Sequence, residues 1–252
     1  MKLLYFTATG NNLYVAKKIG DEYYSIPKLI KEGRFEFEDE KIGIIFPSYF
    51  GSVPTIIEEF LNKVKLNSKY IFAVVSYGSL SGSVIADLLK IGIRNHIQFS
   101  YVNELLMVDN YLPVFDMNKQ KRKEPQKNIE ENLSQIIKDI EVEKKYIREH
   151  PSIIKYLESI QKKVYSKSRT NVKFDKNFYV EDTCNGCNVC TKVCPVDNID
   201  VEKKPVFKGN CQQCLACINH CPQNAIRLKR ERSKARFINQ NITLKEIIDS
   251  ND

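Results

Sequence analysis

All eight cysteines of the chain lie in one stretch, from Cys184 to Cys221. They form two copies of one pattern, in which three cysteines stand three residues apart and a fourth follows four residues later, directly before a proline. The second copy repeats the first after 27 residues (211 − 184). Thiolates bind iron and zinc strongly, so a repeated set of four cysteines predicts two metal centres.

The two runs, residues 184–195 and 211–222, resemble the cysteine signature of two-cluster bacterial ferredoxins. The resemblance implies two [4Fe–4S] clusters, with the fourth cysteine of each run binding the cluster of the other run. The ligands implied for the first cluster are Cys184, Cys187, Cys190 and Cys221. Those implied for the second cluster are Cys211, Cys214, Cys217 and Cys194.

Residues around the cysteines fit this interpretation. Pro195 and Pro222 fix the backbone beyond each crossing ligand and prevent a helix from continuing through it. Ile199 and Ile226 are expected to cover the clusters with apolar surface, which helps to set their potentials. His220 is expected at the surface or beside a ligand, and not as an iron ligand itself.

Zinc and disulfides are the alternatives for these cysteines. A zinc ribbon uses paired Cys-x-x-Cys knuckles, and a disulfide framework would be expected in a secreted chain, whereas no secretory signal is present. No cysteine is missing from either run, which disfavours a three-iron cluster. The thiolates predict a reducing compartment, so we expect a cytoplasmic protein of an anaerobe.

A second stretch whose residues could bind a ligand follows the apolar residues 3–6, which predict a buried strand. It contains hydroxyl and amide side chains and a glycine just before a helical pattern, an arrangement that can bind an anion without Lys or Arg. A plain capping turn is the alternative interpretation. The residues expected to bind, with Gly10 letting the backbone approach the ligand, are Thr7, Thr9, Gly10, Asn11 and Asn12.

This stretch resembles the FMN phosphate loop of flavodoxin, Ser/Thr-x-Thr-Gly-Asn-Thr, except that Asn12 replaces the last Thr. The resemblance implies a bound FMN. The loops after the expected strands 41–46 and 70–76 are similar to those that flank the flavin ring, where Tyr49 or Tyr77 would stack; a half-buried loop aromatic is the alternative. The ring contacts implied are Ser48, Tyr49, Phe50, Gly51, Tyr77 and Gly78.

Residues 107–113 resemble a segment that follows the flavodoxin core in flavodoxin–ferredoxin fusion proteins of anaerobes. That resemblance covers most of the chain, and it implies that Asn110 and Tyr111 either close over the flavin or pack between domains. Strands alternating with helices predict an α/β fold with a doubly wound, flavodoxin-like parallel sheet, whose ligand loops share one edge. Helices and a small α+β ferredoxin domain carrying two clusters are expected to follow.

The expected division is a flavodoxin-like FMN domain (1–118), a helical connecting segment (119–170), a ferredoxin domain (171–230) and a charged C-terminal tail (231–252). In the connecting segment, apolar stripes at 129–147 and 153–164 predict two amphipathic helices. They are expected to pack on the sheet or to bridge it to the cluster domain.

The formal charge of +8 (39 − 31) is expected to offset the negative charge of the clusters and of the flavin phosphate. We therefore expect a solvated basic surface that docks redox partner proteins, acidic ones among them, and not nucleic acid. No apolar run reaches the length of a membrane span.

These features favour an electron-transfer protein that couples one-electron carriers to a redox partner enzyme through FMN and two clusters. The alternative is an FMN-dependent reductase of a small acceptor, such as a quinone or nitro compound, fed by its own clusters. No nicotinamide-binding motif is present.

Overall fold

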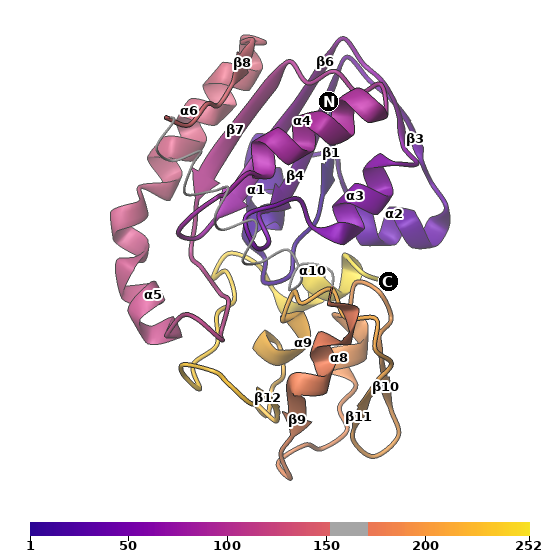
Figure 1. Ribbon diagram of the computed structural model, residues 1–252, viewed down its shortest axis with the longest axis vertical. Coiled ribbons are helices and arrows are strands. Elements are labelled where there is room, and N and C mark those ends of the chain that lie inside the picture. Colours follow the sequence, from indigo (N-terminus) through magenta and orange to yellow (C-terminus); the bar gives the residue numbers. More distant parts are fainter. Residues whose placement is uncertain (152–170) are drawn as a thin grey trace.

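A computed structural model describes residues 1–151 and 171–252 of the chain. It has two lobes, the sheet lobe (1–151) and the cysteine lobe (171–230), with the C-terminal segment (231–252) running back between them (Figure 1). No helix of the described ranges is both long enough and apolar enough to cross a bilayer.

The sheet lobe is built on six parallel strands in the order β2-β1-β4-β6-β7-β8. The strands are β1 (Lys2–Tyr5), β2 (Tyr23–Ser25), β4 (Lys41–Pro47), β6 (Tyr70–Tyr77), β7 (Tyr101–Leu106) and β8 (Tyr146–Ile147). The central strands read as near-continuous apolar runs because helices bury both of their faces. The expected parallel α/β sheet is confirmed. A separate two-stranded pair, β3 (Glu36–Glu38) and β5 (Lys65–Asn67), lies beside it.

Helices cover both faces of the sheet. One face packs against α2 (Ile26–Glu32), α3 (Thr55–Leu61) and α4 (Val84–Arg94). The other face packs against α1 (Asn11–Ile19) and α6 (Ile129–Glu141), whose Leu133, Ile136 and Ile140 enter the core. The expected amphipathic stripe of this last helix therefore packs on the sheet.

The connecting segment differs in part from its expected form. A short helix α5 (Met117–Lys123) and a 3₁₀ turn η1 (Glu124–Lys127) precede α6. That helix ends at Glu141, because Glu143 takes a left-handed conformation (φ 51°) and turns the chain back. Ile147, expected in the helix, lies in the edge strand β8 opposite Val102. The second expected helix, 153–164, falls outside the described residues.

The cysteine lobe pairs β9 (Phe178–Val180) with β12 (Ile226–Leu228), and β10 (Ile199–Val201) with β11 (Pro205–Phe207). It also contains η2 (Val172–Asn177), α8 (Val189–Lys192) and α9 (Ala216–Asn219). The sequence repeat is reproduced in the backbone, where three pairs of residues 27 positions apart all have φ between 48° and 69°. The pairs are Gly186 and Gln213, Asn188 and Leu215, and Asp197 and Asn224.

The C-terminal segment, expected as a charged tail, is folded against both lobes. Phe237, Ile242 and Ile247 are buried. The segment ends in α10 (Leu244–Asp249), which begins at a capping box and packs on the same sheet face as α1. Next to this helix, the hydroxyls of Tyr5 and Ser250 lie 2.7 Å apart in a hydrogen bond. Apolar residues between the charges therefore dock this segment.

Candidate redox site

The structure brings the eight cysteines together as two groups of four. Cys184, Cys187, Cys190 and Cys221, the first group, line one small cavity. Cys194, Cys211, Cys214 and Cys217, the second group, line another. Each group contains the crossing cysteine of the other run, so the two sets expected from the resemblance lie together in space.

Backbone N–H groups point at the crossing sulfurs. The N–H of Asn198 donates to Cys194 Sγ at 3.3 Å, and that of Ala225 donates to Cys221 Sγ at 3.2 Å. These bonds again repeat after 27 residues (225 − 198), and they favour the thiolate form that iron binds. Burial has the opposite effect, since it raises the pKa of Cys190 to about 11. A bound metal centre would offset that cost with its positive charge.

The two groups differ in their surroundings. Cys187 of the first group is exposed to solvent. Cys214 of the second group packs against the apolar cores on both faces of the sheet. Across residues 1–151 and 171–252, no three His, Cys, Asp or Glu side chains converge closely enough to hold a single metal ion.

The sheet lobe contributes a cavity of about 330 Å³. Its walls come from the segments after β1, β4, β6 and β7, which meet at the carboxyl edge of the parallel sheet. The residues expected to contact FMN and found on these walls are Thr7, Thr9, Asn11, Asn12, Ser48, Tyr49, Phe50, Gly51, Tyr77 and Gly78.

Polar side chains from this loop and from the loop after β7 fix the conformation of the loop between β1 and α1. Thr9 Oγ1 accepts a hydrogen bond from Asn110 Nδ2 at 2.6 Å, and Asn12 Nδ2 donates to the Phe6 carbonyl at 3.0 Å. Asn12 thus shapes the loop, while the first N–H groups of α1 have no intrahelical acceptor. The first turn of α1 contains no acidic residue. This helix N-terminus suits an anion such as a phosphate.

Gly10 has a role that the sequence did not predict. It is left-handed (φ 97°), and a Cβ at this position would lie 3.0 Å from the Cβ of Ile242 and 3.1 Å from that of Asn239. Gly10 is not among the residues on the cavity walls. The glycine therefore admits the C-terminal segment, and its approach to a ligand stays a prediction.

The loop after β4 is a tight turn. Tyr49 and Ser52 exchange two backbone hydrogen bonds of 3.0 Å, and Phe50 and Gly51 between them are both left-handed, as a type I′ turn requires. The ring of Tyr49 packs edge-on against Phe6. Burial, and next the neighbouring Cys214 and Cys211, raise the pKa of the Tyr49 hydroxyl, so it stays protonated. Tyr49 thus lies between the cavity and the second group.

The loops after β6 and β7 press against each other at Gly78. A Cβ there would lie 2.2 Å from the Cβ of Asp109, so only glycine fits. Asp109 accepts hydrogen bonds from the Tyr111 N–H (3.1 Å) and the Ser79 hydroxyl (3.2 Å), and burial raises the pKa of its carboxyl. Tyr111 in turn packs edge-on against Phe50 at 5.2 Å between ring centroids. Asn110 and Tyr111 both line the cavity, which is the position that closing over a flavin would require.

Sequence reasoning missed the contribution of the cysteine lobe. Gln213, Cys214 and Leu215 line the cavity opposite the sheet loops. His220 is buried, and a hydrogen bond of 3.0 Å joins its Nε2 to the carbonyl of Ala8 in the β1–α1 loop. It therefore links the residue before Cys221 to the sheet lobe. These contacts join residues about 200 positions apart (220 − 8 = 212), for which a local pattern gives no signal.

Comparison with known families supports the metal-binding lobe. Residues 176–222, which include all eight cysteines, match the family described as 4Fe-4S dicluster domain. The chain matches no curated protein. The cysteine lobe is therefore an iron–sulfur, electron-transfer domain, attached to a parallel-sheet α/β lobe.

Proposed function

We propose that this protein is an electron carrier in which FMN, bound in the cavity of the sheet lobe, exchanges electrons with two [4Fe–4S] clusters. One observation carries the proposal: a single cavity is lined both by the loops expected to hold the flavin and by Cys214 of the second group. A flavin in that cavity would be in contact with a ligand of an iron–sulfur cluster.

The shape of the sheet lobe supports FMN as the ligand. The main sheet can be renumbered along the chain by leaving out the separate β3–β5 pair. Its first five strands then follow the order 2-1-3-4-5, which is that of flavodoxin-like folds. The volume of about 330 Å³ lies within the range of small-molecule sites. Aromatic side chains of Tyr49, Phe50, Tyr77 and Tyr111 offer flat apolar walls, and the N-terminus of α1 offers a phosphate site.

Bound FMN would supply the exchange between two-electron and one-electron chemistry, and each cluster would carry one electron. The chain's own residues bind and orient these groups and exclude water. Tyr49, Cys214 and Leu215 close the space between the cavity and the second group. Because both sites belong to one chain, the transfer between them does not depend on protein concentration.

The test is the iron, acid-labile sulfide and flavin content of the chain purified without oxygen. The proposal requires about eight irons, eight sulfides and one FMN per chain. Full iron without flavin, even after incubation with FMN, would overturn the flavin part and leave the clusters standing. Zinc in place of iron would overturn the clusters, and with them the electron exchange.

A second candidate function, reduction of a small acceptor by FMN, is favoured by Asp109. This residue is the one carboxyl among the described residues that line the cavity, and burial raises its pKa toward the range of a proton donor. Saturable turnover of one acceptor by the reduced protein, lost in Asp109→Asn, would support an enzyme. Slow, unselective oxidation would support the carrier.

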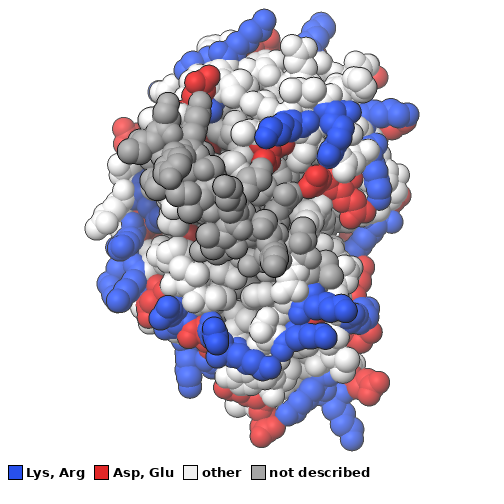
Figure 2. Space-filling model, viewed as in Figure 1, with Lys and Arg blue, Asp and Glu red and all other residues white. Residues whose placement is uncertain are grey.

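The proposed partner is a redox protein with an acidic docking face. Lys and Arg side chains are spread over the visible face of both lobes, with Asp and Glu between them (Figure 2). Exposed Cys187 marks the place where a partner would come nearest to a cluster.

A further inference from the structure

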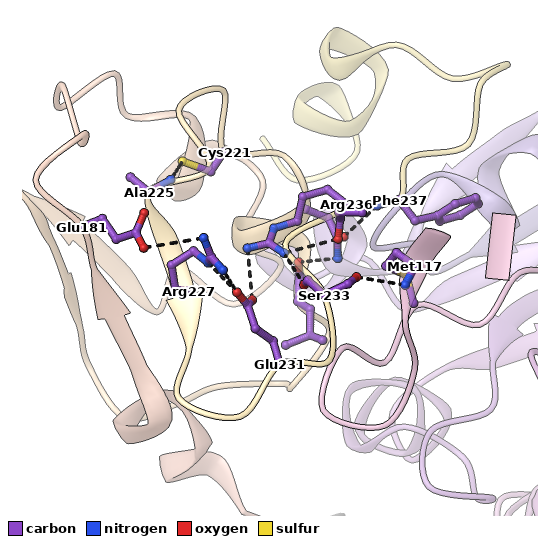
Figure 3. Close-up of polar contacts among 12 residues, drawn as sticks. Met117, Glu181, Cys221, Ala225, Arg227, Glu231, Ser233, Arg236 and Phe237 are labelled. Carbon is purple, nitrogen blue, oxygen red and sulfur yellow. Dashed lines mark hydrogen bonds and ion pairs between the residues drawn. The ribbon is translucent and has the colours of Figure 1, made fainter. Parts of the chain in front are cut away.

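Three charged side chains are buried together beside the first group of cysteines. The side chains of Arg227, Glu231 and Arg236, here called the charged triad, are 6%, 7% and 8% exposed. Both guanidinium groups bind the carboxylate of Glu231, Arg236 at 3.1 Å (Figure 3). Arg227 lies in β12, two residues after Ala225, whose N–H donates to Cys221 Sγ.

The charged triad has a net charge of +1 (2 − 1). Burial, and next the neighbouring Arg227, lower the pKa of Arg236 to about 10, so this guanidinium is still protonated at neutral pH. A fourth charge, Glu181, lies 3.6 Å from Arg227, but its side chain is 36% exposed and water screens it. The first group therefore faces a buried net positive charge.

The second group faces the opposite charge. Asp175 is 4% exposed and accepts hydrogen bonds from Asn198 Nδ2 (2.8 Å) and from the Gly209 N–H (3.0 Å), two residues before Cys211. Lys31 and Asp197, which also lie near Cys194, form an ion pair of 2.7 Å with no net charge. Among the residues that the structure describes, a buried carboxylate is therefore the uncompensated charge beside the second group.

We propose, on the basis of the two clusters proposed above, that the charged triad raises the potential of the first cluster while Asp175 lowers that of the second. Reduction adds one negative charge to a cluster, which a buried cation stabilises and a buried anion destabilises. One electron would leave the second cluster, which becomes oxidised, and reduce the first, with no proton or further reactant involved. The electron therefore rests on the first cluster, next to exposed Cys187.

The experiment is a redox titration of the full-length, anaerobically purified protein, followed by electron paramagnetic resonance of the two reduced clusters. Arg236→Gln should lower the higher of the two cluster potentials, and Glu231→Gln should raise it. Each change should alter the equilibrium for sharing an electron between the clusters about tenfold, which is about 59 mV for one electron. Asp175→Asn should raise the lower potential.

The opposite signs separate charge from structure, because loosened packing would shift both triad variants in the same direction. Arg236→Lys keeps the charge and should keep the potential. The control is Lys234→Gln, a charge change at an exposed position of the same segment, which should leave both potentials unchanged. Shifts of the same sign in Arg236→Gln and Glu231→Gln, or a shift of the lower potential in either, would overturn the proposal. Iron and sulfide assays on the same samples report separately whether both clusters are present.

Discussion

The two groups of cysteines share one ligand pattern and occupy very different places in the molecule. In the first group, Cys187 is exposed to solvent, and the charged triad lies near Cys221 (Figure 3). The second group faces the sheet lobe, where Cys214 is part of the cavity wall. A repeat of sequence thus fixes how the cysteines are grouped, while the rest of the chain decides what each group contacts.

This difference implies that the two groups are suited to exchange electrons with different partners. A centre in contact with the cavity can exchange electrons with a ligand there, and a centre close to the surface can exchange them with another protein. The following experiments test whether the inner side, meaning the second group and the cavity, can be changed separately from the outer side, the first group.

The largest effect is expected from two matched cysteine variants. Cys214→Ser and Cys187→Ser should each lose one cluster, about half of the iron, because serine replaces a thiolate ligand. In Cys214→Ser the fluorescence of bound flavin should rise, since the neighbouring cluster no longer quenches it, whereas Cys187→Ser should stay dark. An equal rise in flavin fluorescence in both variants would contradict the idea that only the second group lies next to the flavin.

A smaller but still large effect is expected from Ile247→Ala in α10. Ile247 is fully buried against the sheet, so truncation should leave a cavity and lower the free energy of unfolding by about 2 to 5 kcal/mol. Denaturant titration of the folded, cluster-loaded protein measures this change. The potential of the first cluster should stay at its original value, and a change there would contradict the separation of the two sides.

Asn239→Ala should weaken flavin binding moderately. Asn239 Nδ2 donates to Asn11 Oδ1 at 3.2 Å in the loop before α1. Loss of one such hydrogen bond costs about 1 kcal/mol, so flavin affinity should fall about fivefold in a fluorescence titration. Asn241→Ala is the control, because this exposed neighbour bonds to Asn239 and not to the loop. The flavin part of the proposal predicts no loss in the control.

The smallest effect is expected at the ion pair between Lys17 of α1 and Glu246 of α10. The hydrogen bond from Lys17, and next that from the Thr243 N–H, lower the pKa of Glu246 to about 2. A lowered carboxyl pKa stabilises the folded state above its usual value of 4.5, and this contribution disappears as the pH falls toward 2. Glu246→Gln should cost less than about 1 kcal/mol at neutral pH, and the difference from the parent should shrink below about pH 4.

Much of the site could be predicted because its signals are local. The cysteine spacing was sufficient to predict which four cysteines lie together. The order of strands and polar loops was sufficient to predict a shared cavity at one edge of the sheet. These features depend on residues close in sequence, or on the rule that parallel strands end at one edge.

The rest depends on contacts between distant residues. Residues 231–252 were expected as a charged tail, because composition cannot show that Arg227, Glu231 and Arg236 pair with one another. The close packing of Asn239 and Ile242 on Gly10 likewise has no local signal in the sequence. Nothing in the sequence around His220 indicated its hydrogen bond to the carbonyl of Ala8.

The hydrogen bond from the Asn239 N–H to the Thr9 carbonyl bears on how the protein is made. These residues are 230 positions apart (239 − 9), so the ribosome synthesises the loop long before it synthesises the C-terminal segment that binds it. The Asn239 N–H becomes available only after the cysteine lobe, which precedes it in the chain, has been synthesised. The loop before α1 can therefore take its final form only near the end of translation.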